Sequence, residues 1–298
     1  MTVKINAGTV AGKFRMVAIK PDGTERILAD WFDNLITNAG LDRLATGSTV
    51  MSQAVVGSGN TAPANSDTSL AAYVAVTGTT TSSANGSSPS APYYGWYRNT
   101  YRFSAGVATG TLREIGVGWN YGSGGLFSRA LIKDSNGDPT SVVVLADEVV
   151  DVTYELRLYA PSSDATFDVD ISGTTYSCVL RASYVTSSYW VPMRAGGAMG
   201  DTYVRAYSGD IGTITQQPSG TQNAIDVTWD PYVPGSYELN AVFTAQLTHA
   251  NFAGGIKSVA FQSSWLGTYQ CSFTPAIPKD ANKVLTLDAT ISWARHAG

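Results

Sequence analysis

Few side chains in this sequence have the types and spacing that catalysis requires. The 298 residues include two histidines, His249 and His296. His249 has no Cys, Asp or Glu neighbour at metal-ligand spacing, and His296 stands near the C-terminus, where chains often fray. No nucleophile elbow, P-loop or zinc-protease motif is present. A Ser–His–Asp site assembled from distant segments stays open, but no feature favours it. We therefore expect a protein that is not an enzyme and has no cofactor.

Two groups of acidic residues match cation sites only in part. Asp134, Asn136 and Asp138 have the spacing of a calcium-loop start, but Pro139 stands where such a loop needs glycine. The Asn-Gly pair within this segment is instead a strong hairpin signal. Asp168 and Asp170 would share one strand face, where solvated carboxylates are usual. We expect no metal site in either group.

Aromatic residues provide the clearest candidates for a binding surface. Residues 93–103 alternate, so one strand face would carry Tyr93, Tyr97, Tyr101 and Phe103, and the other Tyr94, Trp96, Arg98 and Arg102. We expect the first face to join a core and the second to meet another domain, a subunit or a ligand, since Tyr, Trp and Arg are enriched at interfaces. Tyr189 and Trp190 are further candidates of the same kind. In both groups a core or subunit interface is favoured over a glycan site, because aromatic residues are usually buried for packing.

The elements that would position these residues are strands. Residues 150–158 and 285–293 alternate apolar and polar side chains with a period of two, which indicates half-buried strands. The sequence predicts an all-β fold of two tandem β-sandwich-like domains, 1–162 and 163–298. One short helix is expected near residues 37–45, with Thr37 or Asn38 as its N-cap. Residues 77–90 are small or polar throughout, and we expect them to form a flexible, exposed loop.

The second half echoes the first. Residues 112–117 match residues 256–261 in pattern, and the segment from Asp147 matches the segment from Asn282. A duplicated β domain is one explanation, and the resemblance of all alternating strands to one another is the other.

Composition limits the class of partner. Charged residues make up 14% of the chain and the net charge is −4, which argues against nucleic-acid binding. No apolar run approaches a membrane span, and no secretory signal is evident, so we expect synthesis in a cytoplasm with Cys178 and Cys271 as reduced, buried thiols. Low charge also suits a protein that packs against copies of itself.

One set of motifs resembles a known class of proteins. It comprises Asn34 to Ile36, then Gly57, Gly59, Thr61, Pro63, Asp67 and Leu70, and then Arg113 to Gly116, ahead of VTYELRLY. Over roughly residues 30–160 the chain resembles virion structural proteins of tailed bacteriophages. Such proteins are tail, tail-fibre or baseplate components.

The resemblance implies assembly instead of chemistry. It implies a place in the virion, at the tail tip, baseplate or fibre attachment, with other tail proteins and copies of the chain as partners. A trimer or a six-fold-compatible ring would match the symmetry of a tail. A tail protein that binds a host-surface glycan or receptor, and a capsid decoration protein, remain as alternatives.

Overall fold

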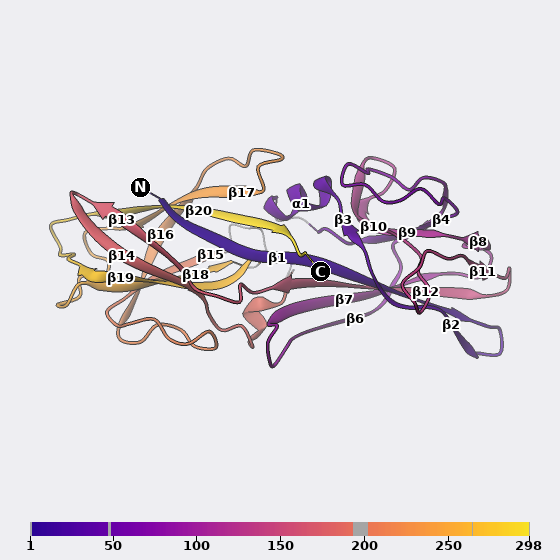
Figure 1. Ribbon diagram of the computed structural model, residues 1–298, viewed down its shortest axis with the longest axis horizontal. Helices are drawn as coiled ribbons and strands as arrows, with labels where there is room; N and C mark the ends of the chain where they lie inside the picture. Colours follow the sequence, from indigo (N-terminus) through magenta and orange to yellow (C-terminus); the bar gives the residue numbers. More distant parts are fainter. Residues whose placement is uncertain (1, 47–48, 193–201, 264, 298) are drawn as a thin grey trace.

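Strand β1 (Thr2–Ile19) runs through both halves of the molecule (Figure 1). The computed structural model describes residues 2–46, 49–192, 202–263 and 265–297. The first part of β1 pairs in parallel with β20 (Leu285–Arg295), and the second part pairs antiparallel with β12 (Val149–Tyr159). β12 ends at Tyr159 and the next strand begins at Ala165, and β1 pairs with strands on both sides of this connection.

Strands also form most of the remaining structure, which confirms the predicted all-β class. The N-terminal half adds β2 (Glu25–Asp33), β3 (Leu35–Ile36), β4 (Gln53–Gly57), β5 (Tyr73–Thr77), β6 (Thr80–Ser87), β7 (Tyr94–Phe103), β8 (Gly110–Leu112), β9 (Glu114–Asn120), β10 (Gly125–Leu131) and β11 (Val142–Val144). The C-terminal half adds β13 (Ala165–Ile171), β14 (Thr174–Ala182), a 3-10 turn η1 (Ser188–Trp190), β15 (Thr202–Tyr207), β16 (Gln222–Trp229), β17 (Glu238–Ala245), β18 (Ile256–Ser263) and β19 (Gly267–Ile277).

The two halves repeat one strand order. In the N-terminal half a sheet runs β3-β10-β9-β4-β5, and in the C-terminal half the corresponding order is β14-β19-β18-β15-β16. The pairs β12-β7 and β20-β17 then lie on the two sides of β1. The segments that echo each other in the sequence therefore occupy equivalent places, β9 with β18 and β12 with β20. The halves differ at β16, which also pairs with β17 and so joins the C-terminal strands to the 13-stranded sheet.

Buried apolar side chains of both halves form one continuous core. On the N-terminal side Phe14 of β1 packs on Tyr154 of β12, with 4.7 Å between the ring centres. On the C-terminal side Phe243 stacks on Phe261 at 5.9 Å. A continuous core and a shared strand make the junction between the halves a packed region.

The single short helix α1 (Asn38–Ala45) lies where the sequence predicts it. Thr37 is its N-cap, and the Thr37 hydroxyl accepts a hydrogen bond from the backbone N–H of Gly40 at 2.9 Å. Leu41 and Leu44 are buried on one face, as their spacing requires.

Strand β6 replaces the flexible loop expected at residues 77–90, so that prediction is wrong. β6 pairs antiparallel with β7 along its length, for example Asn85 with Tyr97. Its side chains are nearly all exposed, as expected, because it forms the outer edge of the sheet. Main-chain hydrogen bonds to β7 hold it in place, and these require no apolar side chain.

Candidate functional site

The outward face of β7 brings four of the sequence candidates together. Tyr94, Trp96, Arg98 and Arg102 are half-buried and alternate with residues that point the other way. On the opposite face the side chains of Tyr101 and Phe103 are fully buried, and those of Tyr93 and Tyr97 pack against the core. The predicted division of the two faces of β7 is confirmed.

Arg98 lies at the centre of the outward face of β7. Its guanidinium group is 4.8 Å from the ring centres of both Trp31 and Trp96. It also forms an ion pair with Glu155, whose Oε2 is 3.0 Å from the Arg98 Nε. The buried Glu155 carboxylate takes a second ion pair from the Nε of Arg157 at 2.6 Å. Two guanidinium groups on one carboxylate, with aromatic rings beside them, fix the side chains of this group.

Both ends of the same face are held in a similar way. Arg102 makes two hydrogen bonds to the Asp151 carboxylate, at 2.8 and 2.7 Å, and these raise the pKa of Arg102. At the other end Arg157 lies 4.6 Å from the ring centre of Tyr94, which packs at 5.1 Å on Tyr159. Charges on this face are largely neutralised while the aromatic rings stay partly accessible. This combination suits contact with another protein surface.

Trp190 does not have the exposed position expected of an interface or ligand residue. Its side chain is fully buried, and its indole N–H donates a hydrogen bond to the Ser183 carbonyl at 2.7 Å. Its backbone packs against Gly95 of β7, on the side opposite to Trp96, so closely that a Cβ at Gly95 would clash with the Trp190 carbonyl. Trp190 is therefore a packing residue between the halves. Its neighbour Tyr189 is half-buried.

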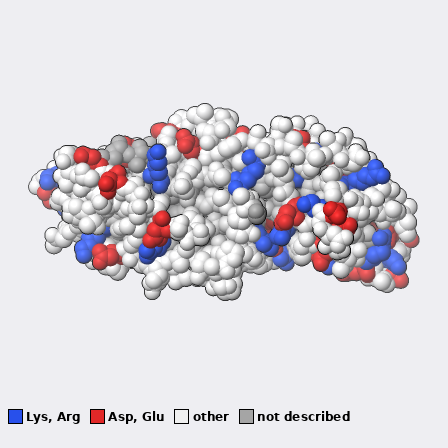
Figure 2. Space-filling view, viewed as in Figure 1, with Lys and Arg blue, Asp and Glu red and all other residues white. Residues whose placement is uncertain are grey.

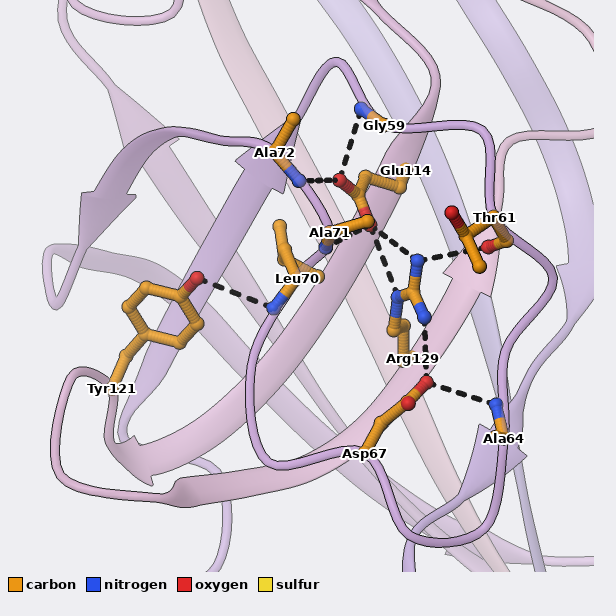
Figure 3. Close-up of polar contacts among 10 residues, drawn as sticks. All are labelled: Gly59, Thr61, Ala64, Asp67, Leu70, Ala71, Ala72, Glu114, Tyr121 and Arg129. Atoms are coloured by element: carbon orange, nitrogen blue, oxygen red, sulfur yellow. Dashed lines mark hydrogen bonds and ion pairs between the residues drawn. The ribbon is translucent and has the colours of Figure 1, made fainter.

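A buried ion-pair network joins four residues of the sequence resemblance, Gly59, Thr61, Asp67 and Glu114 (Figure 3). Glu114 on β9 is fully buried, and its carboxylate accepts hydrogen bonds from the backbone N–H groups of Gly59, Ala71 and Ala72 at 2.9, 3.0 and 2.7 Å. These donors come from both ends of the loop 58–72. The Glu114 carboxylate therefore holds both ends of the loop in place.

Arg129 on β10 completes this network. Its side chain is 2% exposed, and its Nη2 lies 2.7 Å from the Glu114 carboxylate. Its Nη1 lies 2.6 Å from Asp67, and Nη2 also donates to the Thr61 carbonyl at 2.9 Å. The Asp67 carboxylate in turn accepts from the backbone N–H of Ala64 at 2.9 Å. Arg129 thus links the middle of the loop to the Glu114 carboxylate, which binds the two ends of the loop.

The protonation state of the network follows from these contacts. Burial alone would raise the pKa of Glu114, but the backbone hydrogen bonds and the pairing with Arg129 lower it. For Arg129, burial would lower the pKa, and hydrogen bonds to Asp67 and Glu114 raise it. Both groups are therefore charged at neutral pH, and each is occupied by internal partners. This chemistry stabilises a loop and leaves the Glu114 carboxylate no free lone pair directed at solvent.

Arg129 is the member of this network that the sequence analysis missed. It stands in LFSRALI, a strand that is otherwise apolar or small, and a charge in such a strand needs a buried partner. The glycines of the motif also have a physical reason. A Cβ at Gly59 or Gly57 would clash with the Glu114 side chain.

The remaining sequence candidates have local structural roles. The Asp134 carboxylate accepts from the backbone N–H groups of Asn136 and Asp138, at 2.8 and 3.1 Å, as a tight turn requires. Asp168 accepts from the Ser177 hydroxyl at 2.8 Å. Cys178 and Cys271 are buried free thiols. Among the described residues no three His, Cys, Asp or Glu side chains are grouped so that they could hold a metal ion.

No protein-family model, curated protein or solved structure matches this chain. In the ranges that the structure describes, none of the helices has the length and apolar character needed to cross a membrane.

Proposed function

We propose that the chain is a non-enzymatic structural component of a tailed-phage virion, placed at the tail tip, baseplate or fibre attachment. The observation that carries this proposal is the buried network of Glu114, Arg129 and Asp67. Gly59, Thr61, Asp67 and Glu114 belong to the motif shared with such virion proteins, and all of them meet in this network. The motif residues thus have a structural role, which suits a protein that assembles with partners.

The network gives the loop of residues 58–72 a fixed conformation. Residues 58–72 are mostly exposed, yet the network beneath them holds both ends and the middle. A loop whose conformation is set before binding loses less entropy when a partner docks. Both oxygens of the buried Glu114 carboxylate accept hydrogen bonds from internal donors, which supports a role in assembly over a role in acid–base chemistry.

A second surface supports assembly, the outward face of β7 together with the adjoining edge strand β6. β6 presents eight residues of sequence TTSSANGS at the edge of the large sheet, without the Lys or Pro that commonly protect such edges. An unprotected edge can pair with a strand of another chain. Figure 2 shows a band without charged side chains near the middle of the molecule, with charged side chains on both sides of it. These features favour copies of the chain and other tail proteins as partners, in a trimer or a six-fold-compatible ring.

Two measurements test the proposal. Peptide mass spectrometry of particles purified from a lysed culture should find the chain in the virion, in a copy number that is a multiple of three. Light scattering of the purified protein should show a closed oligomer. Absence of the chain from purified particles would overturn the virion proposal, and a monomer at high concentration with a single copy per particle would overturn the oligomer.

A further inference from the structure

A cavity of about 240 Å³ opens in the C-terminal half, over strands β15, β16 and β18. Four tyrosines from two segments line it, namely Tyr184, Tyr189, Tyr203 and Tyr207. We propose that this cavity, which we call the tyrosine cavity, is a saccharide-binding site. The proposal stands apart from the role in assembly, because the site uses neither the β7 face nor the loop 58–72.

The sheet sets the positions of the side chains in the tyrosine cavity. Tyr203, Arg205 and Tyr207 are alternate residues of β15, so they point to the same side of the sheet, while the residues between them are buried in the core. Across the sheet Tyr203 is opposite Gln262 of β18, and Tyr207 is opposite Gln222 of β16. Side chains carried on paired strands are held more precisely than side chains on loops.

The tyrosine cavity offers both kinds of contact that a sugar ring needs. Tyr203 is 59% exposed, so its ring can receive the C–H face of a sugar. The Tyr207 hydroxyl donates to Oε1 of Gln217 at 3.2 Å, and Nη1 of Arg205 donates to Oε1 of Gln222 at 2.9 Å. Both bonds use the amide oxygens and hold the glutamines in place.

The amide nitrogens of these glutamines are then available as donors. Among the described residues, neither Gln217 nor Gln222 uses its Nε2 in a hydrogen bond, and the Gln262 amide makes no hydrogen bond at all. Each amide nitrogen carries two N–H groups. Three amides around an aromatic wall can therefore donate to several hydroxyl oxygens of one ring.

The charge and the volume of the tyrosine cavity limit the class of ligand that it can bind. Arg205 is the one charged side chain that lines the tyrosine cavity among the described residues, so a neutral or acidic sugar fits and a cation does not. The volume lies below the roughly 300–1,000 Å³ typical of sites for drug-sized ligands. The cavity therefore takes one ring at a time, and the rest of an oligosaccharide would continue outside.

The test uses the full-length protein on an array of neutral, N-acetylated and uronic-acid-containing oligosaccharides, followed by calorimetric titration of the strongest ligand. Tyr203→Ala should weaken binding at least tenfold, and Gln262→Leu should also weaken it. Both side chains lie at the surface of a paired sheet, so thermal melts should change little. Tyr73→Ala is the matched control, since Tyr73 is 52% exposed and lies on β5 in the other half; it should bind like the wild type.

Three results would overturn the tyrosine cavity as a saccharide site. They are no binding to any sugar of the array at millimolar concentration, equal binding by wild type and Tyr203→Ala, and capture of peptides in place of sugars on a parallel peptide array. None of these outcomes touches the proposed place in the virion, which is decided by the content of the particles.

Discussion

Replacement of Glu114 by Gln should destabilise the N-terminal half strongly. The amide keeps the size of the side chain but removes the charge that faces Arg129 and one of the two acceptor oxygens. Glu114 is fully buried and the Arg129 side chain is 2% exposed, so water cannot take over the lost interactions. Arg129 would keep its ion pair to Asp67 and its hydrogen bond to the Thr61 carbonyl.

Two contributions set the magnitude of the Glu114→Gln effect. Removal of one partner from a buried ion pair costs about 3–5 kcal/mol, and the remaining pair to Asp67 places this variant near the lower value. Three backbone N–H groups and the guanidinium group now share the two oxygens of Glu114. The single oxygen of Gln would leave at least one buried donor unpaired, which costs about 1–3 kcal/mol. We expect a total of about 4 kcal/mol.

Denaturant unfolding followed by tryptophan fluorescence measures this loss in the free energy of unfolding. Asp151→Asn is the matched control, because its partner Arg102 has a side chain that is 41% exposed, and it should cost about 1 kcal/mol or less. The double variant Glu114→Gln/Arg129→Met should be less destabilised than the sum of the single variants, since neither Glu114 nor Arg129 is then left as a buried charge without its partner, although Asp67, which is 21% exposed, loses its ion pair. A loss below about 1 kcal/mol for Glu114→Gln, equal to that of the control, would refute the structural role of the network.

Three further predictions concern pH and packing. The pKa of Glu114 is lower in the folded than in the unfolded protein, so its carboxylate stabilises the fold above the unfolded pKa of about 4.3, and this contribution is lost as pH falls through the folded pKa. In denaturant titrations the difference in the free energy of unfolding between wild type and Glu114→Gln should therefore become smaller as pH falls below about 4. A difference that grows at low pH would contradict this prediction. Gly95→Ala should lower the free energy of unfolding by about 1–3 kcal/mol or more, because its methyl group would clash with the Trp190 carbonyl. The control Gly78→Ala should melt like the wild type, because the atom nearest to its methyl group would lie 3.6 Å away. Trp96→Ala should leave the melting temperature nearly unchanged and weaken self-association in sedimentation experiments by about 2 kcal/mol; a loss of about 3–5 kcal/mol in folding stability instead would make Trp96 a core residue.

Features that depend on neighbouring residues could be predicted from the sequence. The helix α1 follows from a threonine cap and two leucines one turn apart, all within eight residues. The two faces of β7 follow from alternation alone, because successive side chains of any strand point to opposite sides. The turn at Asn136-Gly137 likewise depends only on local backbone preferences.

Features that depend on distant partners could not be predicted. β6 has no apolar side chain larger than alanine, and its strand conformation comes from main-chain bonds to β7, which no side-chain pattern reports. The sequence motif contained Glu114 and Asp67, but their common partner Arg129 lies 15 and 62 positions away. Trp190 was a candidate for an interface or ligand site because of its aromatic type alone, and tertiary packing buries it completely.

The parallel pairing of β1 with β20 has a mechanical consequence. Residues 2–10 and residues 288–295 run side by side in the same direction. A force that pulled residue 2 and residue 295 apart would act along the strands and would load all the hydrogen bonds between them at the same time. A force perpendicular to the strands would instead break these bonds one after another. Tension along the long axis of the molecule would thus be carried from one half to the other by backbone hydrogen bonds, with β12 on the far side of β1 sharing the load.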